Sequence, residues 1–448
     1  MTKFKKIMLG SLATVSGVVA VTATSCGGPK YTEEELQAQK IVDNVYLVTD
    51  GGSVSDKSFN EQGKNALEYI LTGTGLNTLN NINSPLKVDA EDIAKGYITA
   101  DNKENVEFVI APGFNHITAM GKFFKNHKDT NLKFILVDGV HNPMDFSAKP
   151  PVAVWDAQHE KNVAGITFNT NESAFFVGVY AAKYLVEIMK DDTPMVSAWG
   201  GGNFPGVTDF ITGFINGVKY YNETLLPEFK KTTPSAKAVK FALSSNRTEQ
   251  FNSGFEPKGK GEGIAKALIG AGADIIMPVA GSQTKNLLDE IAKSSDEVKG
   301  RVKVIGVDTD QKLAFGDKSQ YFLTSVEKNL KDAIIKVYTK LLKEANKDNP
   351  DFKLTKALES VTIEESIKGL GETTVGTLEN GLVSFSTPSK KLAGGKYEEA
   401  QKLYEQIKND ATIRAKALDK DNPAGAWTDA TKDDWQAKID DLNAKAGW

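Results

Sequence analysis

The residues best suited to binding chemistry lie directly after short apolar segments of the chain. The segment at residues 45–49 is followed by Asp50, two glycines and several hydroxyl residues, and then by Asp56, Phe59 and Asn60. Carboxylates accept hydrogen bonds from hydroxyl groups, and aromatic rings stack on planar groups. This combination indicates a site for a small polar molecule that has a flat part.

Five further apolar segments end in residues of the same kind. Small, acidic or aromatic residues follow them, at 112–114, 138–139, 200–202, 280–283 and 308–311. Asp often begins a turn, so any one of these ends has a purely structural explanation. Six of them in one chain favour a ligand-binding cleft.

The sequence patterns of common catalytic and metal sites are absent from the chain. It has no HExxH, GxSxG or Walker A motif, and its four histidines lack the spacing of metal ligands. The GGGNFPG segment at 200–206 could cradle a phosphate, but it lacks the GxGxxG order and a following lysine. We interpret it as a tight turn that lines the cleft, and we expect no enzymatic activity, no cofactor and no metal.

Composition limits the classes to which the chain can belong. Its 448 residues exceed the usual size of one hydrophobic core, so two or three domains are expected. The hydrophobic content of 40% and charged content of 25% are typical of globular proteins. The formal net charge of −4 argues against a nucleic-acid partner, because proteins that bind nucleic acids carry a basic surface.

Short apolar segments alternate with amphipathic ones from residue 45 to about 346, which predicts strands and helices in turn. The predicted strands are 45–49, 107–111, 133–138, 163–168, 195–199, 239–244, 274–279, 302–308 and 321–326. Several are apolar throughout, as in parallel sheets that helices cover on both faces. Nine strands over about 300 residues suit two α/β sheets better than one. Ligands of such sheets bind beyond the carboxyl ends of the strands.

Two helix starts are marked by polar residues. Ser58 and Glu61 have the spacing of a capping box, in which the serine hydroxyl bonds the helix backbone. Asn171 is placed to cap a second helix, predicted from about residue 172 to 189.

An export signal precedes the predicted folded region. Three lysines among the first six residues are followed by a mostly apolar stretch at 7–21, by small residues, and by Cys26, the single cysteine of the chain. We expect residues 1–26 to be a lipoprotein signal peptide, Cys26 to carry the lipid, and residues 27–40 to form a tether. The mature protein would then lie on the extracellular face of the cell membrane. The alternatives are an ordinary secreted protein or an anchor helix, for which the stretch is short.

The end of the chain differs from the rest. From Lys396 onward it is charged and helical in pattern, and it contains Trp427, Trp435 and Trp448. We expect a helical C-terminal extension over 388–448 that docks on the body of the protein. A module that binds a partner is the alternative.

The motif VYLVTDGGSVSDKSFNEQGKNAL, which begins at Val45, resembles the opening motif of the basic membrane lipoprotein family. These are substrate-binding lipoproteins of ABC importers, typified by purine nucleoside receptor A. Similar segments follow, including FVIAPGF, FILVDG, VAGITFNTNESAFFVGVYAA, GFEPKGKGEGIAKALIGAGADIIMPVAG, VIGVD and LTSVEKN. The resemblance covers roughly 43–385, while inserts near 71–95 and 217–236 and the tail after about 388 depart from the family pattern.

The resemblance implies an α/β fold of the type I periplasmic-binding-protein kind. Two doubly wound α/β lobes would be joined by three crossovers, with a ligand cleft between them. We expect 41–165 and 309–350 to form lobe 1, and 166–308 and 351–387 to form lobe 2.

The resemblance also implies the residues that hold the base of a nucleoside. Phe59 and Phe255 match the two aromatic rings between which the base lies, although Phe255 could instead be a core aromatic. Asp50 matches the carboxylate after the first strand, and Asn60 lies beside the stacking ring. Asp138 is a further match at the edge of the base, across a length change in the alignment.

The sugar would be held by residues from the second half of the chain. Asp308 matches a carboxylate that binds the ribose hydroxyls, and Lys328 matches the lysine near the sugar, with a solvated surface lysine as the alternative. Gly281 would bring the backbone close to the ligand.

The implied function is a lipid-anchored receptor that captures a nucleoside, in particular a purine nucleoside. The receptor would deliver it to a separate ABC permease and ATPase. Alternatives are a receptor for a different small ligand, a surface lipoprotein acting as an adhesin or interaction protein, and an exported nucleoside-processing enzyme.

Overall fold

The computed structural model describes residues 44–51, 53–72, 74, 77–145, 147–256, 259–386, 397–417 and 432–448. The predicted signal peptide, Cys26, the tether and Trp427 lie outside these residues. Within the described ranges, no helix is both long and apolar enough to cross a membrane.

Lobe 1 is built on a six-stranded parallel sheet in the order β13-β7-β4-β3-β1-β2. Its strands are β1 (Val45–Val48), β2 (Ile82–Asn83), β3 (Phe108–Pro112), β4 (Lys133–Val137), β7 (Val163–Phe168) and β13 (Glu372–Gly376). Val45 and Leu47 face a core shared with α2 (Phe59–Ile70) and α14 (Leu330–Ala345). Tyr46 and Val48 face the other core, shared with α3 (Ala90–Asp101) and α4 (Asn115–Asn126). This alternation explains why the strands are apolar on both faces.

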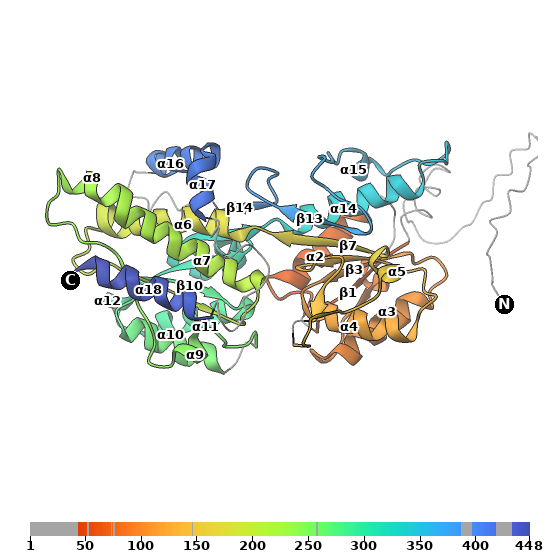
Figure 1. The fold of residues 1–448 in the computed structure, drawn as a ribbon, viewed down its shortest axis with the longest axis horizontal. Coiled ribbons are helices and arrows are strands. Elements are labelled where there is room, and N and C mark those ends of the chain that lie inside the picture. Colours follow the sequence, from red (N-terminus) through yellow and green to blue (C-terminus); the bar gives the residue numbers. More distant parts are fainter. Residues whose placement is uncertain are drawn as a thin grey trace, which may run out of the picture.

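Lobe 2 is built on a second six-stranded sheet in the order β14-β12-β11-β10-β8-β9. Its strands are β8 (Met195–Gly200), β9 (Lys240–Phe241), β10 (Ile275–Val279), β11 (Lys303–Asp308), β12 (Phe322–Lys328) and β14 (Val383–Phe385). All pairs are parallel except β12 with β14. One face packs on α6 (Thr170–Lys183) and α7 (Pro205–Tyr220), and the other on α10 (Lys260–Gly270) and α11 (Thr284–Lys293). The predicted two-lobe α/β fold is confirmed (Figure 1).

The chain passes between the lobes three times: from β7 to α6, from β12 to α14, and from β13 to β14. The predicted lobe boundaries are therefore wrong in part. Of the segment 309–350 assigned to lobe 1, β12 belongs to the sheet of lobe 2, because only the short α13 (Gln311–Ala314) and η5 (Gly316–Tyr321) separate it from its neighbour β11. Of the segment 351–387 assigned to lobe 2, β13 pairs with β7 in lobe 1.

The start of α2 is capped differently from the prediction. Ser58 precedes the helix but makes no capping bond with its side chain. The Asp56 carboxylate caps the helix instead. It accepts hydrogen bonds from the N–H groups of Ser58, Asn60 and Glu61 at 2.9 to 3.1 Å. The second predicted cap also shifts, since α6 starts at Thr170 and Asn169 is the capping position. Because Asp56 caps α2, the hydroxyl of Ser58 is available for a contact elsewhere.

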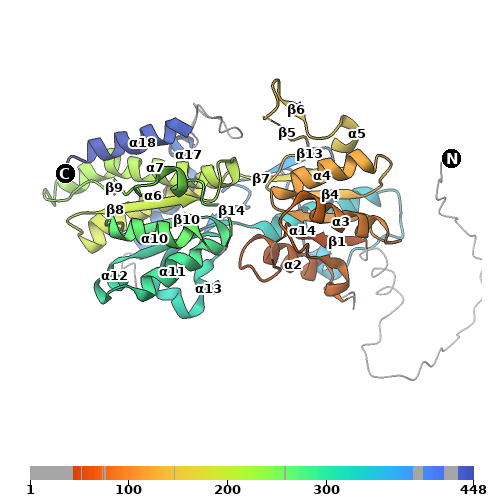
Figure 2. The same cartoon turned by 90° about the horizontal axis from the view of Figure 1, so that it is seen from below.

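The described part of the C-terminal extension is helical and docks on lobe 2 (Figures 1 and 2). Its helices are α16 (Tyr397–Asn409), α17 (Ala411–Ala417) and α18 (Lys432–Ala446). The Asn443 side chain bonds both the N–H and the C=O of Phe241 in β9, at 2.7 and 2.9 Å. The indole of Trp448 donates to the carbonyl of Ala238 at 2.7 Å. The extension thus covers the edge of the second sheet at β9.

Candidate functional site

The carboxyl ends of strands from the two lobes meet at one buried lysine. Lys328 ends β12 in lobe 2, and its side chain is 1% exposed. Its ammonium group lies 2.7 Å from a carboxylate oxygen of Asp138, which follows β4 in lobe 1. It also donates to the carbonyl of Gly206 at 3.3 Å and lies 3.7 Å from a carboxylate oxygen of Asp308. An ion pair therefore joins the lobes at the predicted site, and Lys328 is not a solvated surface lysine.

Aromatic rings surround the same ammonium group. Its nitrogen lies 4.8 Å from the ring centre of Phe59, 5.1 Å from that of Phe210 and 5.9 Å from that of Phe168. A cation over an aromatic face is attracted by the ring quadrupole. The contact places Phe59 of lobe 1 next to the predicted sugar-binding lysine.

Asp138 and Asp308 share an unusual backbone conformation. Their φ angles are 62° and 67°, in the left-handed region that few residues other than glycine adopt. Residues in this region cluster at binding sites, where the surrounding structure holds them. Burial raises the pKa of Asp308, and the neighbouring Lys328 opposes that shift. The hydroxyl that Ser58 does not use for capping donates to Asp308 at 3.0 Å, from the other lobe.

Asn60 positions the carboxylate of Asp50. Its side-chain amide donates to Asp50 at 3.0 Å and to Asp56 at 2.9 Å, while its oxygen accepts from the Asp50 backbone at 3.3 Å. Asn115 donates to the other oxygen of Asp50 at 3.2 Å. A Cβ at Gly113, where φ is +116°, would lie 2.6 Å from that same oxygen. Asp50 is thus fixed by side chains at the starts of two helices, α2 and α4.

Phe255 lies in a cluster of three aromatic rings. It is 38% exposed, so it is not a core residue. Its ring centre lies 5.7 Å from that of Phe114 and 5.9 Å from that of Phe204, and these two rings are 4.1 Å apart. Phe114 follows β3 in lobe 1, whereas the other two belong to lobe 2, so the three rings also join the lobes. Between the residues that the structure describes, no ring contact links Phe255 to Phe59, and their sandwich remains a prediction.

Gly281 opens the short helix η4 (Gly281–Gln283) with φ of +53°. A Cβ there would meet no atom within 4 Å, so the backbone conformation, and not crowding, is the reason for glycine. The adjacent Ser282 and Gln283 hold the loop of Phe255: the serine bonds the Phe255 carbonyl at 3.0 Å, and the glutamine amide bonds the Gly254 carbonyl at 3.0 Å.

Asp209, in the second turn of α7, was not among the predicted site residues. Burial raises the pKa of this carboxyl to about 7, Lys328 opposes the shift and Asp138 adds to it. The residue nevertheless keeps part of its surface accessible. Its place in the helix after the glycine-rich segment at 200–206 could have indicated it. The other carboxylates of the site were predicted because they lie at the end of a predicted strand, and Asp209 does not.

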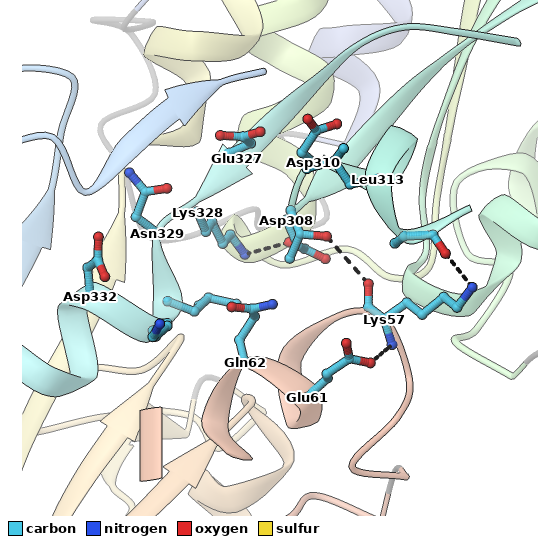
Figure 3. A pocket seen from close by; sticks show the side chains of 14 residues that line it. Lys57, Glu61, Gln62, Asp308, Asp310, Leu313, Glu327, Lys328, Asn329 and Asp332 are labelled. Carbon is cyan, nitrogen blue, oxygen red and sulfur yellow. Dashed lines mark hydrogen bonds and ion pairs between the residues drawn. The ribbon is translucent and has the colours of Figure 1, made fainter. Parts of the chain in front are cut away.

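A cavity of about 490 Å³ opens between the lobes beside these residues (Figure 3). Asp308 and Lys328 form part of its wall, with Glu61 and Gln62 from α2 and Glu327 from β12. Its lining also contains Lys57, Thr309, Asp310, Leu313, Ala314, Asn329, Leu330, Lys331 and Asp332. The Lys57 ammonium bonds the Ala314 carbonyl and lies 4.5 Å from the ring centre of Phe315, which closes the lobes on this side.

The site offers hydrogen-bond acceptors, one shielded ammonium group and aromatic rings from both lobes. No cluster of three or more metal-ligating side chains occurs in the described part of the chain. The arrangement is suited to recognising hydroxyl or amino groups and a planar ring.

Comparison with known proteins gives a family match and several relatives. The model of the family described as "ABC transporter substrate-binding protein PnrA-like" matches residues 44–233 and 248–358. The chain is 28% identical over 338 residues to the "ABC transporter nucleoside-binding protein BmpA" of Lactococcus lactis, covering 72% of this chain and 79% of that protein. It is 24% identical, over an alignment of 461 residues, to the "Uncharacterized lipoprotein MG040" of Mycoplasma genitalium, covering 85% and 73%.

A solved structure shows the same fold. An ABC transporter solute-binding protein from Aeropyrum pernix K1 superposes with a TM-score of 0.59 at 16% identity, covering 90% of this chain and 98% of that one.

Proposed function

Because the chain belongs to the PnrA-like family of ABC transporter substrate-binding proteins, we propose that its ligand is a nucleoside, in particular a purine nucleoside, bound between the two lobes. The family consists of binding proteins that serve a transporter, and not of enzymes. Support for the ligand class comes from the name of the relative from Lactococcus lactis and from the acceptors and rings that meet in the cleft.

The observation that carries this proposal is the meeting of Lys328, Asp138 and Asp308 from opposite lobes beside the ring of Phe59. Ribose presents hydroxyl groups that carboxylates accept, and a base presents a flat face for an aromatic ring. A ligand that touches both lobes stabilises the closed arrangement over the open one. Capture of the ligand by this chain then follows from binding and closure, without a chemical step.

The test is isothermal titration of the mature chain without its lipid, residues 27–448, after unfolding and refolding to remove bound ligand. Adenosine, guanosine, inosine, uridine and thymidine are the probes. We expect tight binding of purine nucleosides, strongly weakened by Phe59→Ala and by Asp308→Asn. The matched control is Asp192→Asn, at an exposed position of lobe 2. If none of the five nucleosides binds, the ligand class is wrong.

We further propose that a lipid on Cys26 anchors the protein at the extracellular face of the membrane. Two relatives from Mycoplasma species carry the word lipoprotein in their names. Two or more acyl chains hold a protein stably at a bilayer, whereas one does not. Incorporation of a labelled fatty acid should be abolished by Cys26→Ala; incorporation that persists in this variant contradicts the assignment.

A permease and an ATPase are the expected partners of any substrate-binding protein of this family. In our proposal the permease receives the closed, nucleoside-loaded form, because only closure brings the two lobes into one fixed arrangement.

A further inference from the structure

The charges around Lys328 are unbalanced. Its ammonium group pairs with Asp138 at 2.7 Å and lies 3.7 Å from Asp308. Asp209 is a third carboxylate in this group, since the charges of both Lys328 and Asp138 act on it. Three carboxylates therefore share one ammonium group in a crowded space between the lobes.

The position of Asp209 on α7 places it at this centre. It lies three residues after Gly206, whose carbonyl accepts a hydrogen bond from Lys328 and whose Cβ, if present, would lie 2.8 Å from a carboxylate oxygen of Asp138. It directly precedes Phe210, whose ring centre is 5.1 Å from the ammonium nitrogen. Helix α7 thus presents a carbonyl, a ring and a carboxylate to the same lysine.

Asp209 also differs from the other carboxylates in its partners. Asp50, Asp56, Asp138 and Asp308 all accept hydrogen bonds from protein groups. Among the described residues, no hydrogen bond or ion pair is formed by Asp209, although its surroundings are crowded. A carboxylate that is partly accessible and strongly desolvated is expected in the wall of a deep crevice. A carboxylate left there without a donor is unfavourable unless a ligand supplies one.

We propose that Asp209 is a further ligand-binding residue, whose carboxylate accepts hydrogen bonds from hydroxyl or amino groups of the bound nucleoside. With Asp138 and Asp308 it makes the cleft select uncharged or cationic ligands that carry such donors, and disfavour anionic ones. This inference deepens the proposed function and rests on it.

A dependence of binding on pH follows from the surroundings of Asp209. The groups that face it are Asp138 at the end of β4 and Lys328 at the end of β12, with Asp308 of β11 beyond the lysine. Burial raises the pKa of Asp209 to about 7, so near neutral pH the carboxyl is partly protonated. Because the ionised form is the better acceptor, affinity for the nucleoside should rise as the pH increases from 6 to 8.

The experiment measures the Kd of inosine for residues 27–448 at pH 6, 7 and 8, in the wild type, in Asp209→Asn and in the control Asp192→Asn. We expect a several-fold tightening from pH 6 to 8 in the wild type and in the control. Asp209→Asn should bind inosine roughly tenfold more weakly at pH 8, the loss typical of a hydrogen bond to a charged group. Its pH profile should be flatter than that of the wild type.

Thermal unfolding without ligand shows whether the variant is folded. Asp209→Asn should raise the Tm relative to wild type at pH 8 and leave it unchanged at pH 5, because it removes a carboxylate that is costly only when ionised. Asp209→Ala is a second variant in which the loss of affinity must recur. If the wild type binds inosine but both variants match its Kd and pH profile, Asp209 does not bind the ligand. If the wild type binds no nucleoside at any pH, the proposed function itself fails, and this inference fails with it.

Discussion

Replacing Lys328 by methionine tests whether the ion pair between the lobes holds them closed. The substitution keeps the apolar stem of the side chain but removes its charge from between Asp138 and Asp308. Removing one partner of a buried ion pair costs about 3–5 kcal/mol, because the remaining charge stays buried without compensation. Here the side chain is 1% exposed and 2.7 Å from its partner, so a cost of about 3 kcal/mol is a reasonable lower figure.

That cost applies mainly to the closed arrangement. Asp138 belongs to lobe 1 and Lys328 to lobe 2, so separating the lobes lets water reach Asp138. A cost of about 3 kcal/mol corresponds to roughly a hundredfold shift from closed to open. When the closed and open forms are comparably populated without ligand, this shift leaves almost all of the variant open, and the apparent Kd for a ligand that needs the closed form rises by nearly the same factor.

The assay combines small-angle X-ray scattering with isothermal titration. Lys328→Met should increase the radius of gyration of the ligand-free protein and weaken inosine binding about a hundredfold. The control is Lys347→Met, at an exposed position just after α14. Asp138→Asn should act in the same direction, and the double variant should be less impaired than the sum of the two, because the Asp138 charge is then no longer left buried without its partner. Unchanged scattering together with unchanged affinity would refute the reasoning, while weaker binding without opening would mean that Lys328 acts only by touching the ligand.

Three further predictions test other parts of the structure. Asp56→Ala removes the cap of the helix after the first strand and should lower the free energy of unfolding in urea by about 1 kcal/mol. Ser58→Ala should leave this helix intact but weaken inosine binding, and equal effects of the two would contradict the assignment of the cap. Gly113→Ala places a Cβ 2.6 Å from a carboxylate oxygen of Asp50, at a residue whose φ is +116°, and should lower the free energy of unfolding by more than about 1 kcal/mol. The control Gly270→Ala places its Cβ in open space and should not lower it. Asn443→Ala loses two hydrogen bonds to the edge strand of the second sheet, so we expect a loss of about 1–3 kcal/mol in urea unfolding, and no loss would show that the extension is not stabilising.

The parallel strands were predictable from the sequence because burial on both faces leaves a continuous apolar segment. The predicted strand 163–168 matches β7, and 302–308 matches β11 within one residue. β13 was missed because its sequence, ETTVG, is partly polar and lies at a sheet edge. β12 was assigned to the wrong lobe. The sheet that a strand joins depends on the strand that lies beside it, and the local sequence does not show which strand that is.

The candidate site was predictable where a carboxylate follows a strand. Asp50, Asp138 and Asp308 stand out for this reason, and the structure brings Asp138 and Asp308 to one lysine. Asp209 could not be found in this way, because it becomes part of the site only through the packing of α7. The neighbours of Phe255 depend likewise on two loops that meet across the cleft.

The burial of Lys328 has a consequence for the covalent chemistry of its amine. Reagents such as acetic anhydride attack lysine amines that solvent can reach, and this amine is enclosed by rings and carboxylates from both lobes. It can be acetylated only while the lobes are apart, whereas exposed lysines such as Lys128 react at all times. The ratio of the two acetylation rates, read by mass spectrometry, therefore measures the fraction of time that the protein spends open.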